Sequence, residues 1–133
     1  MNQTGRIIIA GCLSAALAVM IGAFGAHGLK DLLQMNDRME TYELAVRYHF
    51  YHSFGILFVG LLSPTINLRW AWWACILHCL GIIFFSGSLY VLAITNQRML
   101  GMITPIGGVM FIAGWLLVIA AIFQSQHFRK RSE

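Results

Sequence analysis

The chain has 133 residues, of which 59% are hydrophobic and 11% are charged, and its formal net charge is +4. Soluble domains carry about 25% charged residues, so this composition excludes an ordinary water-soluble globular protein. A chain of this length has room for one compact unit, and we expect a single domain over residues 1–133.

Four apolar stretches are long enough to cross a bilayer, because a helix of about 20 residues spans the hydrocarbon core of ~30 Å. They cover Ile7–Leu29, Ala45–Leu62, Trp70–Ala93 and Pro105–Phe123. None of them alternates with a period of two, as the strands of a membrane barrel would. The sequence therefore predicts an all-α integral membrane bundle of four transmembrane helices.

Small residues recur along the first and fourth stretches, where they allow helix backbones to approach closely in lipid. In the first stretch they form a stripe with a spacing of four, and in the fourth Gly107, Gly114 and Ala121 are seven apart. The residues that we expect to carry helix packing are Ala18, Gly22, Gly25, Gly107 and Gly108.

The second stretch begins with a polar, amphipathic extension. Asp37 and Glu40 have the spacing of a capping box, which predicts a helix whose N-cap is Asp37. On this helix the polar residues Glu40, Glu43, Arg47 and Tyr51 share one face, and Ala45, His49, His52 and Ile56 share roughly the opposite face.

The third stretch carries a seam of small and polar residues with heptad spacing, which predicts burial against a neighbouring helix. The seam consists of Ala71, Ala74, His78, Gly81, Phe85 and Ser88.

Four spans place both termini on one side of the membrane. Lysine and arginine favour the cytoplasm for that side by a margin of one charge, with Arg6, Arg69, Arg129, Lys130 and Arg131 against Lys30, Arg38, Arg47 and Arg98. We interpret the cluster at positions 129–131 as an anchor to anionic lipid headgroups, and three charges do not indicate nucleic-acid binding.

Antiparallel threading of the four helices brings several polar residues to one end of the bundle. They form a candidate polar or ligand site consisting of His27, Arg47, His52, Ser86, Tyr90 and Thr104. The simpler alternative is an interhelical hydrogen-bond network in which His27 bonds to Ser86 or Tyr90. We expect His78 nearer the opposite end, so the threading offers no histidine pair across one layer.

No combination of nucleophile, base and acid is apparent, and neither a phosphate-binding loop nor a zinc signature is present. Cys75, His78 and Cys79 have spacings of three and four, yet tetrahedral zinc sites usually need four ligands. We predict no enzymatic activity, no catalytic residue, no metal ligand and no cofactor.

Four short motifs occur in order along the chain, at Gly22–His27, Tyr48–His52, Phe85–Tyr90 and Thr104–Gly108. Together they resemble the small membrane proteins of the domain of unknown function 423 (UPF 0382) family, which is related to transmembrane protein 256. The resemblance covers essentially the whole chain. It implies a bacterial inner-membrane protein with several spans, and it implies no reaction. His27, His52, Ser86, Tyr90, Thr104 and Pro105 match the family pattern, whereas His49 and His78 are particular to this chain.

Three functions remain open at this point. The first is a non-enzymatic membrane component that binds membrane lipids, further copies of the chain or other membrane proteins. The second is a small transporter or channel that acts as an oligomer, with a polar site at the end that holds His27, Arg47 and His52. The third is a haem or metal carrier.

Overall fold

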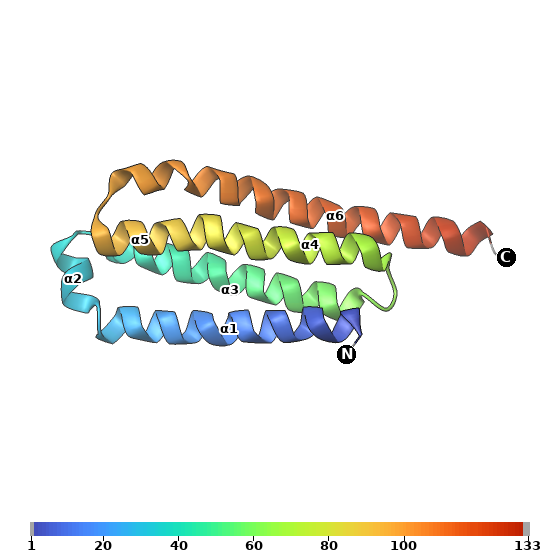
Figure 1. Cartoon of the computed structure of the whole chain (residues 1–133), viewed down its shortest axis with the longest axis horizontal. Helices are drawn as coiled ribbons and strands as arrows, with labels where there is room; N and C mark the ends of the chain where they lie inside the picture. The colour runs from blue at the N-terminus through green and yellow to red at the C-terminus, as the bar shows by residue number, and fades with distance from the viewer. Residues whose placement is uncertain (1, 132–133) are drawn as a thin grey trace.

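The computed structural model describes the backbone of residues 2–131 and the side chains of residues 2–125, and this part of the chain is helical without any strand. Four long rods lie side by side, and the two ends of the chain lie at the same end of the bundle (Figure 1). The all-helical prediction is confirmed. The side chains of the basic cluster at positions 129–131 lie outside the described residues.

The first half of the chain contains α1 (Gln3–His27), the short α2 (Lys30–Met35) and α3 (Met39–Leu62). The second half contains α4 (Leu68–Gly81), the π-helical segment η1 (Ile82–Gly87), α5 (Ser88–Thr95), the 3-10 segment η2 (Arg98–Met102) and α6 (Thr104–Arg131). Because α4, η1 and α5 follow one another without a break, they form one rod.

The helices form two hairpins. In the first hairpin α1 packs on α3, and in the second α6 packs on α4 and η1. The hairpins meet where α3 contacts α4, η1 and α5, so α3 lies at the centre of the bundle (Figure 1). This central position explains why α3 is buried on two adjacent faces, with Ser53, Gly55 and Gly60 buried beside its main seam.

Among the described residues, three helical stretches are long and apolar enough to cross a membrane: Gln3–His27, Leu68–Thr95 and Arg98–Ser125. The fourth rod, α3, has 24 residues but carries Glu40, Glu43 and Arg47, and it is not among the three. It runs without a break from Met39 to Leu62, and the amphipathic extension at its start stays a prediction. A count of four spans therefore stays a prediction.

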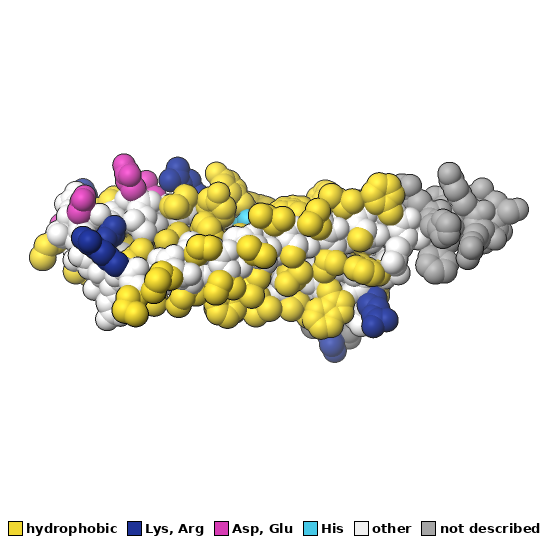
Figure 2. Space-filling view, turned by 90° about the horizontal axis from the view of Figure 1, so that it is seen from above, with side chains coloured by type: hydrophobic (Ala, Val, Ile, Leu, Met, Phe, Trp, Pro, Cys, Tyr) yellow, Lys and Arg dark blue, Asp and Glu magenta, His cyan; other side chains and the backbone are white. Residues whose placement is uncertain are grey.

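The surface is suited to lipid. Figure 2 shows hydrophobic side chains over the middle of the bundle, with acidic and basic side chains gathered at the α2 end and further basic ones toward the other end. Large apolar side chains such as Leu13, Phe54 and Val109 are 59–66% exposed. A monomeric soluble protein rarely exposes so continuous an apolar surface.

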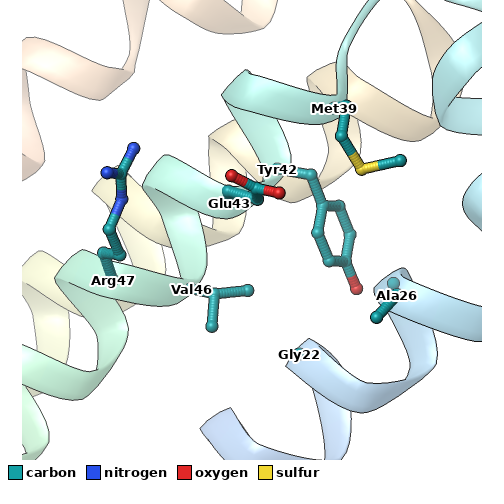
Figure 3. A pocket seen from close by; sticks show the side chains of 8 residues that line it. Gly22, Ala26, Met39, Tyr42, Glu43, Val46 and Arg47 are labelled. Atoms are coloured by element: carbon teal, nitrogen blue, oxygen red, sulfur yellow. The ribbon is translucent and has the colours of Figure 1, made fainter.

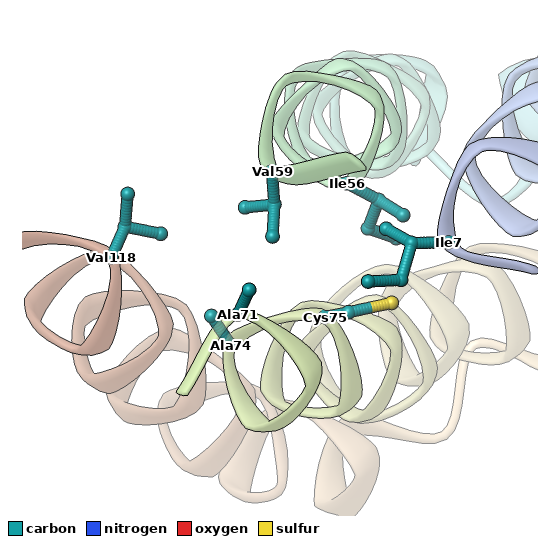
Figure 4. Close-up of a cluster of buried hydrophobic side chains, with 7 residues drawn as sticks. All are labelled: Ile7, Ile56, Val59, Ala71, Ala74, Cys75 and Val118. Atoms are coloured by element: carbon teal, nitrogen blue, oxygen red, sulfur yellow. The ribbon is translucent and has the colours of Figure 1, made fainter. Parts of the chain in front are cut away.

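A cluster of buried aliphatic and small side chains holds the two hairpins together (Figure 4). Ile7 of α1 and Ile56 and Val59 of α3 are fully buried, and they face the small residues of α4. The cluster consists of Ile7, Ile56, Val59, Ala71, Ala74, Cys75 and Val118. Small residues on α4 let α3 and α6 approach closely, which increases the number of van der Waals contacts.

Burial along the helices follows the predicted seams. On α3, Glu40, Glu43 and Arg47 are exposed, and the opposite face is buried from Tyr42 to Ser63 at heptad spacing. The seam on the third rod is buried except for Phe85, which is half-buried. On α1 the buried positions Ile7, Gly11, Ala18 and Gly25 follow a spacing near 3.5 rather than four. That period is the one that keeps two crossing helices in contact.

The predicted capping box at Asp37 is wrong. Asp37 has a left-handed backbone (φ 54°), and it follows α2 rather than opening α3. The Arg38 N–H donates to the Leu33 carbonyl at 2.9 Å, and the Asp37 N–H donates to the Gln34 carbonyl at 3.1 Å. These two bonds form a Schellman motif, which ends α2. Aspartate tolerates this conformation, so Asp37 ends α2, whereas the sequence predicted that it begins the next helix.

Candidate functional site

Tyr42 and Gly25 set the geometry of the first hairpin near the α2 end. The Tyr42 ring lies where a Cβ atom on Gly25 would be, so only glycine fits at that position. The Tyr42 hydroxyl donates to the Ile21 carbonyl of α1 at 2.9 Å, and its side chain is 4% exposed. Tyr42 therefore fixes the separation of α1 and α3 at this level.

Beside Tyr42 the surface is hollowed between the two helices, and we call this hollow the α1–α3 groove (Figure 3). It has a volume of about 270 Å³. Its lining consists of Gly22, Gly25 and Ala26 from α1, and Met39, Tyr42, Glu43, Val46 and Arg47 from α3.

The groove is apolar inside and charged at its edge. Gly22 and Ala26 leave room because their side chains are small, and Val46 and Met39 supply apolar walls. Glu43 and Arg47 are both exposed and extend from α3 as separate groups (Figure 3). A concave apolar surface with a few charged groups is the usual form of a small-molecule or lipid site.

A buried polar network joins three helices deeper in the bundle. The Ser14 hydroxyl of α1 lies 3.2 Å from Nε2 of His49 and 2.6 Å from the Ser53 hydroxyl, both on α3. Nδ1 of His49 lies 3.2 Å from the Tyr90 hydroxyl of α5. Hydrogen bonds of this kind hold membrane helices in register.

A second polar contact lies between α3 and α4. Nδ1 of His52 is 3.3 Å from Nδ1 of His78, both rings are buried, and the His52 ring stacks on Phe111 of α6. The prediction that His78 lies nearer the opposite end is wrong. His52 lies ten residues before the end of α3 at Leu62, and His78 lies ten residues after the start of α4 at Leu68, so an antiparallel pair brings them level.

The histidine pair has the spacing of a hydrogen bond. A tetrahedral metal ion with bonds of ~2 Å also holds two ligand nitrogens about 3.3 Å apart, so the number of further ligands, and not this distance, decides whether a metal site is present. Within the part of the chain that the structure describes, no group of three or more histidine, cysteine or acidic side chains is arranged to hold a metal ion. The cysteines Cys12, Cys75 and Cys79 are free thiols.

A second groove, of about 370 Å³, lies between α3 and α6. It is lined mainly by aromatic side chains, and the lining consists of Tyr48, His52, Phe85, Gly108, Phe111, Ile112 and Trp115. Nε2 of His78 and the Ser86 hydroxyl are buried nearby, and neither has a hydrogen-bond partner among the described residues.

The six residues of the predicted polar site do not share one cavity. His27 is exposed at the end of α1, two positions from the buried Gly25 and therefore on the opposite side of the helix. Its expected bond to Ser86 or Tyr90 is wrong, because the Tyr90 hydroxyl contacts His49 and the buried Ser86 hydroxyl has no partner among the described residues. Arg47 lines the α1–α3 groove, and the Thr104 hydroxyl lies 2.9 Å from that of Ser88.

The predicted packing residues have unequal surroundings. Ala18 is fully buried, and Gly22 and Gly25 face Val46 and Tyr42. Gly107 is pressed against the backbone of η1, so that a Cβ atom there would collide with the backbone nitrogen of Phe85. Gly108 has ordinary space, since its nearest neighbour is the far side of the Phe85 ring.

Sequence reasoning missed four residues of the α1–α3 groove. Met39, Tyr42 and Val46 carry no signal of their own, because an apolar residue on a helix is usually part of a core. Glu43 stood out only as a charge on the exposed face of α3. The signal that could have found the groove is the coincidence of Gly22, Gly25 and Ala26 with charges four apart on the next helix.

An apolar belt, charged ends and buried polar contacts between long helices define a helical membrane protein. More particularly, the chain belongs to the family described as "Protein of unknown function (DUF423)", whose model matches residues 21–108. The chain is 54% identical over 116 residues to a UPF0382 membrane protein of Staphylococcus epidermidis, and this alignment covers 86% of this chain and 92% of that protein.

Two further relatives carry the same family name. A UPF0382 membrane protein of Staphylococcus haemolyticus is 50% identical over 119 residues, with 88% of this chain and 94% of that protein covered. The UPF0382 membrane protein YwdK of Bacillus subtilis is 41% identical over 118 residues, with 86% and 93% covered. No solved structure matches the chain.

Proposed function

We propose that this protein is a non-enzymatic membrane component that binds phospholipid in the α1–α3 groove. The observation that carries the proposal is the form of the groove. It is apolar within, and Glu43 and Arg47 stand at its edge near the charged end of the bundle. A phospholipid has the same division into an apolar chain and a charged headgroup, and arginine pairs well with phosphate.

The proposal includes four membrane crossings, with α3 as the fourth. The helix α3 runs beside the other rods (Figure 1). The long aliphatic part of the Arg47 side chain can carry its charge to the level of the lipid headgroups. We further propose the bacterial inner membrane and cytoplasmic termini, on the basis of the lysine and arginine distribution. A cysteine replacing Asn2 that reacts with a membrane-impermeant thiol reagent in intact cells, in a background without native cysteines, would overturn that orientation.

Transport and cofactor carriage receive less support. A transport site would need its polar side chains to face one cavity, whereas His27 and Arg47 are exposed and His52 is buried between helices. A metal carrier would be supported by a group of three or more possible ligands, and the described residues hold none. The experiment below distinguishes lipid binding from the binding of a second copy or another membrane protein at the same groove.

The test is native mass spectrometry of the whole chain after gentle detergent extraction. We expect the wild-type protein to retain phospholipid. Ala26→Trp places a large ring in the groove and should abolish retention, whereas Ala16→Trp, at an exposed position of α1 outside the groove, should not. Equal retention by both variants would overturn the groove as the lipid site, and a homodimer lost only in Ala26→Trp would identify it as a protein interface.

A further inference from the structure

The order of the two charges along α3 gives the groove a direction. Glu43 lies four residues after Met39, where α3 starts at the α2 end, and Arg47 lies four residues beyond Glu43. Four residues, slightly more than one helical turn, advance about 6 Å along the helix axis. Because the α2 end is a charged end of the bundle, Arg47 lies one turn deeper toward the apolar belt than Glu43 (Figures 2 and 3).

The apolar lining of the groove lies level with the two charges and outside them, since Tyr42 is adjacent to Glu43 and Met39 lies at the outer end. Deeper than Arg47 the surface continues into the apolar belt of the bundle. Val46 is adjacent to Arg47 and packs against Gly22 of α1, whose Cβ position would be 3.1 Å from a Val46 methyl group. Going outward along α3 from the apolar belt, a cation at Arg47 is therefore followed by an anion at Glu43, with the apolar lining of the groove beside them.

A phospholipid whose headgroup carries a primary ammonium has the complementary sequence of groups. Its acyl chain is innermost, its phosphate follows, and its ammonium lies furthest out. The Arg47 guanidinium can donate two parallel hydrogen bonds to phosphate oxygens. The Glu43 carboxylate can accept hydrogen bonds from the ammonium.

We propose that the α1–α3 groove selects aminophospholipid, with phosphate at Arg47 and ammonium at Glu43. This selectivity rests on the function proposed above, since it names the headgroup of the lipid bound there. Phosphatidylglycerol offers Glu43 no cation, and its negative charge lies near a carboxylate. Phosphatidylcholine has a quaternary ammonium without an N–H, so it cannot donate a hydrogen bond to that carboxylate.

The experiment measures binding of three defined lipids to the delipidated full-length protein by native mass spectrometry. The probes are phosphatidylethanolamine, phosphatidylcholine and phosphatidylglycerol with identical acyl chains. We expect phosphatidylethanolamine to bind about fivefold to tenfold more tightly than the other two, which corresponds to roughly 1–1.4 kcal/mol.

Two variants separate the charges, and two others control for net charge. Glu43→Gln should remove the preference for phosphatidylethanolamine over phosphatidylcholine while the protein still binds lipid, and Arg47→Gln should weaken all three lipids several-fold. Glu40→Gln and Arg98→Gln change the same charges at exposed positions outside the groove and should leave the binding unchanged. All four positions are exposed, so the fold should tolerate these changes; an unaltered melting temperature checks this.

The outcomes distinguish the two proposals. If Ala26→Trp removes lipid binding but the wild type shows no preference among the three headgroups, the selectivity is overturned and lipid binding stays in place. A preference that survives Glu43→Gln would have the same consequence. Binding of no lipid by the wild-type protein, or binding indifferent to Ala26→Trp, would overturn the function itself.

Discussion

The two hairpins of the bundle use the same packing device but complete it differently. In both, glycine on one helix receives a large side chain from the other: Tyr42 at Gly25 in the first hairpin, and Phe111 at Gly81 in the second. Further contacts of this kind follow along both interfaces, with Leu57 at Gly11 and Ile8 at Gly60 in the first hairpin and His78 at Gly114 in the second. Both interfaces also open into a hollow, but their linings differ: the first has Glu43 and Arg47 beside small apolar residues, and the second has Arg69 beside Trp70 and Trp73.

The difference teaches that close packing and the candidate binding surface are separable in this molecule. The close contacts along both hairpins and the cluster between the hairpins hold the fold. The α1–α3 groove instead leaves apolar surface uncovered, and a membrane protein can cover such surface with lipid. Substitutions should therefore divide into those that lower stability without affecting lipid and those that do the reverse.

The largest loss of stability should come from Gly107→Ala. Its Cβ atom would meet the backbone of η1, which cannot move aside as a flexible side chain could. We expect a loss of about 3 kcal/mol, at the upper end of the usual cost of overpacking. Gly108→Ala is the matched control, because its Cβ atom has ordinary contacts. Thermal unfolding followed by tryptophan fluorescence should show a lower melting temperature for the first variant only.

A smaller loss should follow Ile56→Ala in the cluster between the hairpins. Ile56 is fully buried, so truncation leaves a cavity, and we expect a cost of about 2 kcal/mol. The value lies at the low end for such a change because lipid is as apolar as the core. Leu61→Ala, at a position 69% exposed on the same helix, should change the unfolding free energy little. Equal effects of the two changes would contradict the placement of α3.

The histidine pair should contribute a measurable coupling between the hairpins. In a double-mutant cycle of His52→Leu and His78→Leu, we expect a coupling free energy of roughly 0.6–1.7 kcal/mol, as found for hydrogen bonds between membrane helices. The combination of His78→Leu with Ser14→Ala should be additive, because Ser14 bonds to His49 and Ser53 instead. Additive effects of the two histidine changes would show that the 3.3 Å contact contributes nothing.

Ser14→Ala should have a small effect, of about 0.6 kcal/mol. The remaining polar groups keep partners, since the Ser53 hydroxyl still donates to the His49 carbonyl and His49 still contacts Tyr90. Unfolding in a detergent series should therefore show a slight shift. Unfolded or aggregated protein would indicate that the network is indispensable to the fold.

Ala26→Trp should have the smallest effect on stability and the largest effect on lipid. Ala26 is exposed and lines the groove, so the ring fills open space without displacing a core residue. We expect its melting temperature in lipid-free detergent to equal that of the wild type. Added phospholipid should raise the melting temperature of the wild type but not of this variant.

Several features of the fold could be predicted from the sequence because they depend on periodicity along one helix. The buried seam of Ala71, Ala74, His78 and Gly81 follows from spacing alone, and so does the exposed face that carries Glu43 and Arg47. The length and composition of the apolar stretches likewise predict membrane helices.

Features that depend on the register between helices could not be predicted in the same way. The contact of Tyr42 with Gly25 requires the relative height and rotation of α1 and α3. His52 and His78 could have been placed opposite each other by counting outward from the loop between their helices, as described above. The reversed role of Asp37 depends on a left-handed backbone, which aspartate adopts in some contexts and not in others.

The most direct test of the central claim is an exchange of the two groove charges. Glu43→Arg combined with Arg47→Glu keeps the composition, the net charge and the apolar walls, and it reverses only the order of cation and anion along α3. The account predicts that the exchanged protein still folds but loses its preference for phosphatidylethanolamine over phosphatidylcholine and phosphatidylglycerol. An undiminished preference would contradict it, because the groove would then not recognise the order of headgroup charges.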